Sequence, residues 1–283
     1  FYEEDGGYIF KTEPNPNKVL ADERANVQTD DARRLVETVV DDVVGRSNLF
    51  QVTLFGFQNS PAREPGDIPD DGELQLVVLP PRLTHNKGRI DGRTADVIRD
   101  ITENYGKKLR LNRNMVLYLV PDSEYVSGAI DRAMDWRAAQ NVMSDAGLME
   151  RFSEVQQEAI RDRSTTAAND TRDHVRKAYN LVVMLSGANE FDTFELSYVP
   201  PSKRILEQAE EELLVKGRLH RELNPELFNT RWAALWPKTA TVITTQSLWE
   251  KFTRQGEAPI LTSVRVLQNT IRQGVELDYF GYG

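Results

Sequence analysis

The stretch Asn114–Ala133, NMVLYLVPDSEYVSGAIDRA, decides the fold class. It begins with a continuous apolar run, passes through Pro121-Asp122-Ser123, and continues with apolar residues at helical spacing. That order predicts a buried strand, a tight turn and a long helix, the outline of a nucleotide-binding βα unit. We interpret Asp122 or Ser123 as the cap of the helix. The alternative is that both residues line a ligand crevice at the carboxyl end of the strand.

Similar patterns precede this stretch. Helices are predicted over Thr29–Val44 and Thr94–Tyr105, where apolar residues recur every three or four positions. A strand with alternating apolar and polar residues is predicted over Leu49–Gln58, and a solidly apolar strand over Glu73–Leu79, on either side of a loop rich in Pro, Asp and Gly. Helices interleaved with such strands predict an α/β layer over residues 1–122, a mixed sheet with flanking helices.

The next part, residues 123–238, is predicted to be mostly helical. Two long helices, Ser123–Asp145 and Phe152–Met184, form a predicted αα-hairpin. A returning strand over Phe194–Val199 and a helix over Ser202–Leu219 follow. The second long helix has a strongly polar middle, so only a narrow edge of it is expected to be buried.

The tail, residues 239–283, has a different pattern. A short β-like piece at Val242-Ile243 precedes predicted helices over Thr245–Phe252 and Thr262–Gln273. Glu276–Tyr282 alternates as a strand does. Helix, turn, helix and β-edge is the order of a winged-helix domain, so we predict a small winged-helix-like α+β tail.

Basic residues in this tail are candidates for binding DNA, because phosphate contacts come mainly from Lys and Arg. The alternative is an ordinary solvated basic edge. Tyr279 and Tyr282 would stand on the wing, and further basic clusters occur at Arg110–Arg113 and Arg161–Arg163. The candidates in the tail are Lys251, Arg254, Arg265 and Arg272.

Composition limits the function classes. The chain has 283 residues, no cysteine and a net charge of −9, which excludes thiolate metal sites and argues against a whole-surface electrostatic grip on nucleic acid. Its apolar runs are too short to span a bilayer, and Glu3, Glu4 and Asp5 stand where a secretory signal would be basic. We therefore expect a cytoplasmic location, no membrane partner, and a portion of a longer protein.

The motifs of catalysis are not found. The sequence has neither a P-loop nor GxGxxG, and its three histidines are scattered. The acidic residues Asp67, Asp70, Asp71 and Glu73 are those of a solvated loop or of a divalent metal site, with Gln75 where a PD-(D/E)xK nuclease would have Lys. We predict no catalytic, cofactor-binding or metal-ligating residue in this region, and keep a metal-dependent hydrolase as an alternative.

One polar motif resembles that of a known protein family. The segment Tyr8–Lys18 has an apolar-x-F-x-x-x-P-N-x-N pattern, carried by Phe10, Pro14, Asn15 and Asn17. It resembles a family of predicted AAA+ superfamily ATPases of unknown function, encoded beside DNA methyltransferases and helicases in phage-defence islands. The opening stretch and the tail are also similar to that family. Because the Walker motifs are absent, the resemblance implies the region that follows the motor.

The resemblance implies a non-catalytic accessory region of a multidomain, ATP-dependent, DNA-handling protein. Its partner would be the ATPase domain of the same longer chain, and possibly DNA. ATP and Mg²⁺ would belong to the parent protein, with no cofactor in this region. The motif itself has a plainer interpretation as a rigid turn, because Pro fixes φ and Asn favours turns.

Overall fold

The apolar run of the quoted stretch forms β9 (Val116–Pro121), the middle strand of a five-stranded mixed sheet. The order is β11-β10-β9-β4-β3, with β3 at Gln51–Leu54, β4 at Gln75–Val78, β10 at Tyr179–Leu185 and β11 at Phe191–Glu195. β3, β4 and β9 run parallel; β10 is antiparallel to β9, and β11 is antiparallel to β10. Every residue of β4 and β9 is buried, so both faces of these strands are covered. The predicted mixed α/β architecture is confirmed.

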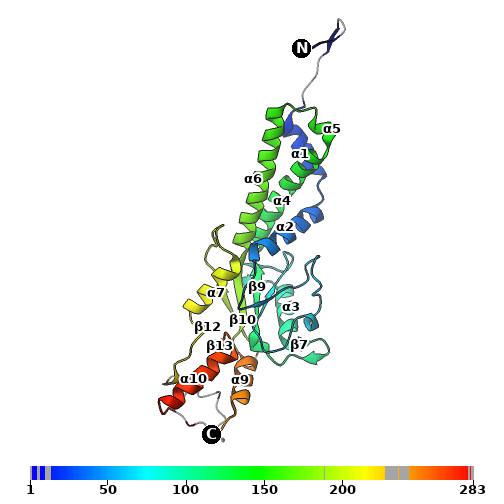
Figure 1. Ribbon diagram of the computed structural model, residues 1–283. Helices are drawn as coiled ribbons and strands as arrows, with labels where there is room; N and C mark the ends of the chain where they lie inside the picture. The colour runs from blue at the N-terminus through cyan, green and yellow to red at the C-terminus, as the bar shows by residue number, and fades with distance from the viewer. Residues whose placement is uncertain are drawn as a thin grey trace. The chain divides into compact units, whose positions relative to one another are not determined.

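The computed structural model describes residues 2–4, 7–9, 14–187, 189–226, 235, 242–279 and 281. The chain divides into two compact units, drawn in Figure 1. Unit 1 comprises Phe1–Val40 and Tyr125–Val175; unit 2 comprises Asp41–Glu124 and Arg176–Gly283. The three-part division expected from the sequence stays a prediction. Within the described ranges, no helix has the length and apolar character needed to cross a membrane.

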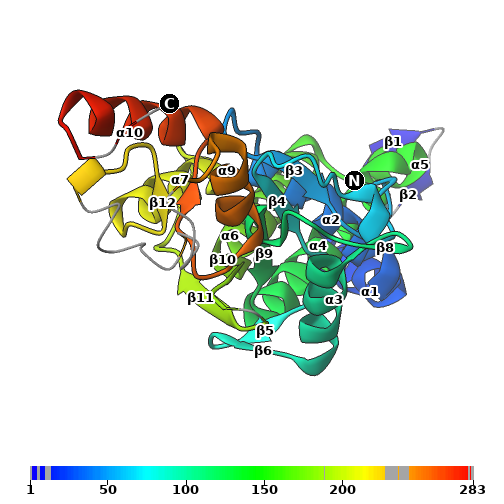
Figure 2. The same ribbon diagram turned by 90° about the horizontal axis from the view of Figure 1, so that it is seen from below.

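The sheet of unit 2 is covered by helices on both sides. α3 (Gly92–Glu103) and α7 (Ile205–Val215) lie on opposite sides of it in both views (Figures 1 and 2). On the α3 side, Ile98 and Ile101 belong to one core cluster with alternate residues of β9. α3 begins after Asp91, whose carboxylate accepts the backbone N–H of Thr94 at 2.8 Å. Burial opposes ionisation of Asp91, but hydrogen bonds from Thr94 and Thr84 outweigh it and lower its pKa.

Short elements complete unit 2. Two hairpins are formed by β5 (His85–Asn86) with β6 (Arg89–Ile90) and by β7 (Asn104–Tyr105) with β8 (Lys108–Leu109). Single 3₁₀ turns are η1 (Pro65–Asp67) and η2 (Arg113–Met115). The C-terminal part contains β12 (Leu219–His220), α9 (Thr245–Arg254), β13 (Ile260–Leu261) and α10 (Val264–Glu276).

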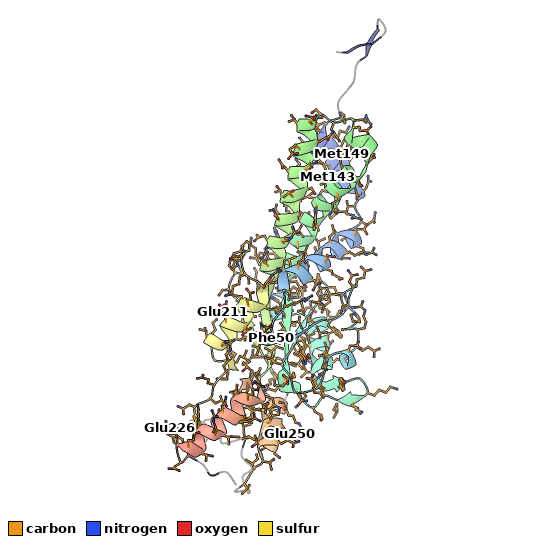
Figure 3. All side chains as sticks on the ribbon, in the orientation of Figure 1. Phe50, Met143, Met149, Glu211, Glu226 and Glu250 are labelled. Atoms are coloured by element: carbon orange, nitrogen blue, oxygen red, sulfur yellow. The ribbon has the colours of Figure 1, made fainter. Side chains whose placement is uncertain are left out.

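Unit 1 joins the N-terminal segment to the long helices. Its N-terminal elements are β1 (Tyr2–Glu4), β2 (Gly7–Ile9), α1 (Pro16–Asn26) and most of α2 (Thr29–Val44). The helical insert between β9 and β10 supplies the others: α4 (Ser123–Ser144), α5 (Ala146–Met149) and α6 (Glu154–Ala178). A Cβ added at Gly128 of α4 would lie 2.5 Å from His174 Cδ2 of α6, so the two helices approach closely there. Val142, Phe152 and Ile160 form a small core with Met143 and Met149, which Figure 3 labels.

The second long helix is shorter than predicted. Periodicity favours a helix through Met184, but α6 ends at Ala178 and the chain enters β10 directly. Residues 179–185 are an apolar run that is buried except at Asn180, and such a run does not distinguish a buried helix from a buried strand. No Gly or Pro marks the junction, so the helix prediction was wrong there.

The tail also differs from the prediction. α10 continues through Gly274 to Glu276, and residues 277–279 form a turn in which Asp278 has φ +59° and Tyr279 N–H donates to Gly274 O. The strand predicted from Glu276 is therefore not formed over residues 276–279; Tyr282 lies outside the described residues. Val242-Ile243 is not a strand either. Instead, β13 pairs in parallel with β12.

Candidate functional site

Asp122 lies at the carboxyl end of β9, where open α/β sheets bind ligands. Its Oδ1 accepts the backbone N–H of Glu124 at 2.9 Å, so Asp122 is the N-cap of α4, as the sequence predicts. Its Oδ2 accepts the N–H of Lys87 at 3.3 Å, from the turn of the β5–β6 hairpin. Only 6% of Asp122 is exposed. The β5–β6 hairpin therefore holds the Asp122 carboxylate at the end of β9, where the alternative prediction was a ligand crevice.

His85 completes this polar cluster. The ring is buried, with Nδ1 lying 3.6 Å from Asp122 Oδ2. Gly88 N–H donates to Nδ1 at 3.1 Å, which assigns the ring proton to Nε2, and Nε2 lies 2.8 Å from Asn180 Oδ1. Both ring nitrogens are engaged, so His85 joins the β5–β6 hairpin to β10. The sequence offered no signal that these residues would meet.

The acidic loop is organised by backbone hydrogen bonds. Asp67 Oδ2 accepts the N–H groups of Arg63 and Glu64, which lower its pKa. The two carboxylate oxygens of Asp70 accept the N–H groups of Leu111 and Asn112, both at 2.8 Å.

Two further carboxylates of this loop, Asp71 and Glu73, were candidates for a divalent metal site. Asp71 Oδ1 accepts the N–H of Glu73 at 3.0 Å. Within the described ranges, no three His, Cys, Asp or Glu side chains are grouped so that they could hold a metal ion. Asp71 thus accepts a backbone N–H of its own loop.

Arg110 is the organising residue that sequence reasoning missed. It is buried, and its guanidinium donates to four carbonyl oxygens: Ile101 O at 2.8 Å, Pro69 O at 2.8 Å, Pro65 O at 2.9 Å and Ile68 O at 3.1 Å. Burial lowers its pKa. Carbonyl dipoles replace the water that this cation loses. Arg110 therefore fixes the acidic loop against the end of α3.

The four candidate DNA-binding residues lie on α9 and α10. Arg254 forms an ion pair with Glu250 at 3.1 Å, and Arg272 lies 4.0 Å from Glu276. Arg272 and Glu276 also line a surface cavity of about 400 Å³ between α9 and α10. Lys251 and Arg265 have no ion pair within the described part of the chain, and Arg265 is exposed.

The tail as a whole is electrically neutral. Residues 239–283 contain Lys251, Arg254, Arg265 and Arg272 against Glu250, Glu257, Glu276 and Asp278. Two of the four cations thus have acidic neighbours on their own helix, and the tail offers no excess of positive charge to an incoming polyanion.

The tail is attached to the sheet by Asn114, the first residue of the quoted stretch. This side chain is buried, and its Nδ2 donates to Phe252 O at 2.8 Å and Ala258 O at 3.1 Å. Close by, a Cβ at Gly256 would lie 2.5 Å from Gly187 O. The tail therefore packs on the sheet through backbone contacts that leave no room for a side chain.

The family-like motif forms the start of α1. Asn15 Oδ1 accepts the N–H of Asn17 at 3.0 Å, and Pro16 occupies the first helical turn, so Asn15 is an N-cap. Pro14 precedes the cap, and Phe10 lies outside the described residues. At the other end of α1, Arg24 pairs with Asp131 and with Asp135, both on α4. Asn141 Nδ2 donates to Glu23 at 2.7 Å.

A surface cavity of about 430 Å³ lies among α1, α4 and α6 of unit 1. Its charged wall residues are Arg24, Arg132, Asp135, Arg163 and Asp170, and Asn17 of the motif also lines it. Arg24 and Arg132 both pair with aspartates of α4, so most of the positive charge at this cavity is neutralised within the unit.

Searches of protein-family models, curated proteins and solved structures found no match to this chain.

Proposed function

We propose that this chain is a non-catalytic accessory region of a multidomain, ATP-dependent, DNA-handling protein of phage-defence or restriction type. It would follow the AAA+ motor and act by docking to that motor or its substrate, as a cytoplasmic protein without a membrane partner. ATP and Mg²⁺ would be bound by the parent protein. The family resemblance at Phe10, Pro14, Asn15 and Asn17 motivates this proposal.

The attachment of α1 to α4 is the observation that supports docking. In the resembling family, the motor lies before the motif that becomes the start of α1. α1 carries Arg24, which is held by Asp131 and Asp135. Force or movement arriving through α1 would therefore reach the helical pair of α4 and α6, which we propose to be an αα-hairpin that docks the motor or its substrate.

The test compares two charge reversals in the longer protein that the proposal implies. Arg24→Glu places a carboxylate beside Asp131 and Asp135, whereas Arg33→Glu, the matched control, disturbs only a pair with Asp30 three residues away. We expect Arg24→Glu alone to reduce DNA-stimulated ATP hydrolysis several-fold without loss of the folded state. Equal rates for the two variants would contradict the docking role, as would ATP binding by this chain alone.

The second candidate is a DNA-binding module that uses the tail as a winged-helix-like reader. The order α9, turn, α10 and the exposed Arg265 favour it, whereas the neutral charge of the tail does not. Binding that weakens steeply with salt and is lost in Arg265→Glu/Arg272→Glu would support it. A third alternative, metal-dependent hydrolysis at Asp70, Asp71 and Glu73, requires a divalent ion that raises the melting temperature.

A further inference from the structure

We propose that residues 105–113, the β7–β8 turn and the segment after it, bind single-stranded nucleic acid. We call this segment the basic hairpin. The proposal deepens the DNA-handling part of the proposed function, on which it rests, and places the contact on the β7–β8 turn and the residues after it instead of on α9 or α10. Its basis is a rigid hairpin that displays two exposed lysines, Lys107 and Lys108, without an ion pair in the described ranges, together with exposed apolar side chains.

Charge is concentrated on the basic hairpin. Its sequence, YGKKLRLNR, has four basic residues and no acidic one, in a chain whose net charge is −9. Lys107 and Lys108 are exposed and have no ion pair within the described ranges. The Arg113 guanidinium donates to Asn189 Oδ1 at 3.3 Å, a neutral partner. These three cations are therefore available to phosphates, unlike the paired Arg254 and Arg272 of the tail.

Large apolar side chains accompany the lysines. Tyr105 is 39% exposed, Leu109 75% and Leu111 55%. Tyr105 pairs directly with Lys108 across the hairpin, and Asn104 with Leu109. Because directly paired residues share a face of a two-stranded sheet, the ring and Lys108 lie on one face and Leu109 lies on the other.

The hairpin is fixed in place while its side chains are exposed. Arg110 anchors it through four carbonyl oxygens, and the Arg110 Cζ atom lies 5.6 Å from the Tyr105 ring centroid. On the η1 side, a Cβ at Gly66 would lie 3.2 Å from Gly106 Cα. The segment ends where Asp70 accepts the N–H groups of Leu111 and Asn112. A ligand would therefore meet a preformed surface and would lose little affinity to ordering it.

Single-stranded nucleic acid matches this chemistry better than other polyanions. Single-strand sites combine cations that follow the phosphates with aromatic rings on which bases stack, and apolar side chains also act as wedges between bases. Tyr105 supplies the ring, Lys107 and Lys108 the charge, and Leu109 the apolar edge. An anionic bilayer would need a larger apolar face, because these apolar side chains are divided between two faces of the hairpin.

The experiment measures fluorescence anisotropy of a labelled oligothymidylate of about 20 nucleotides with the intact chain. Three neutralised phosphates predict a slope of log K against log salt of about −2, or roughly 20-fold weaker binding at 200 than at 50 mM salt. Lys107→Glu/Lys108→Glu should abolish measurable binding. Tyr105→Ala should weaken it at least about fivefold, because stacking on the ring is lost, whereas Tyr105→Phe should bind as the wild type does.

Arg33→Glu/Arg34→Glu on α2 is the matched control, since it reverses two exposed charges outside every proposed DNA contact and should leave binding within about twofold. Arg265→Glu/Arg272→Glu tests the competing tail. Melting curves establish that each variant is folded. Loss with the tail variant but not the hairpin variant would overturn the proposal in favour of the tail. Equal loss with both, absence of wild-type binding, or binding only to anionic vesicles would also overturn it. The Arg24 assay reads docking independently, so either proposal can fail alone.

Discussion

Asn114→Ala tests whether the tail is held on the sheet by one buried side chain. In the native chain, Asn114 Nδ2 donates to Phe252 O and Ala258 O, at 2.8 and 3.1 Å. Alanine removes both donors and leaves two carbonyl oxygens without them in a buried site. Because α9 contains Phe252 and the following turn contains Ala258, the loss falls on the attachment of the tail.

The magnitude follows from the two hydrogen bonds that are lost. A buried acceptor that loses its donor costs about 1–3 kcal/mol, so two would cost roughly 2–6 kcal/mol. Asn114 Oδ1 is itself buried without a hydrogen-bond partner within the described part of the chain, and its removal recovers roughly 1–3 kcal/mol. The net expectation is a loss of about 1–3 kcal/mol in the free energy of unfolding, or roughly 2–5 °C in melting temperature.

The assay combines melting curves with hydrogen exchange on peptides covering α9. We expect faster exchange in α9 than in β9, because the tail loses its attachment while the sheet keeps its core. Asn189→Ala is the control: Asn189 is exposed, and its change should stay within about 0.5 kcal/mol. A melting temperature of Asn114→Ala within about 1 °C of the wild type, or unchanged exchange in α9, would refute the reasoning.

Three further predictions follow from close contacts and buried charge. Gly256→Ala should cost about 1–3 kcal/mol in thermal unfolding, because its Cβ would lie 2.5 Å from Gly187 O; a wild-type melting curve would contradict the contact. Arg110→Lys should lower the free energy of unfolding by about 2–4 kcal/mol and speed proteolysis of residues 63–72, because one ammonium group cannot reach four carbonyl oxygens. Its control is Arg99→Lys, which changes an exposed ion pair. The pKa values of Asp67, Asp91 and Glu212 are all lowered, so their contribution to stability is present above the unfolded pKa, near 4, and is lost as pH falls through the folded values. The urea midpoint of the wild type should therefore drop between pH 5 and pH 3, and that of Asp91→Asn should drop less. An equal drop in the two proteins would show that Asp91 does not contribute to the pH dependence.

The sequence predicted the elements whose pattern is unambiguous. Thr29–Val44 has apolar residues at helical spacing and forms α2 over the same bounds, and the run before Pro121 forms β9. β10 was missed because seven mostly apolar residues after a polar helix carry no period of their own. The end of the tail was misassigned because Glu276–Tyr282 has an alternating pattern and Gly274 was expected to end the helix. In the structure Gly274 is buried inside α10, which continues to Glu276.

Site prediction was limited by contacts between distant parts of the chain. The capping role of Asp122 is local, so sequence indicates it. The meeting of His85 with Asn180 depends on β10 standing beside β9, which the helix prediction concealed. Arg110 looked like one member of a basic cluster, because only the folded loop supplies its four carbonyl partners. A local cap such as Asp122 could be predicted from the sequence, whereas the burial of the Arg110 guanidinium among backbone carbonyl groups could not.

The helical insert leaves and rejoins the sheet at neighbouring strands. β9 and β10 are adjacent antiparallel strands, a pair that a short turn could connect. The chain instead leaves β9 at Asp122 and returns at Ala178, and Asp122 N–H donates to Ala178 O at 2.8 Å. This hydrogen bond holds the first and last residues of the insert together at the end of β9 and the start of β10. A pair of strands that a short turn could join therefore encloses a helical insert, and within unit 1 that insert is attached to α1 through Arg24, which pairs with Asp131 and Asp135.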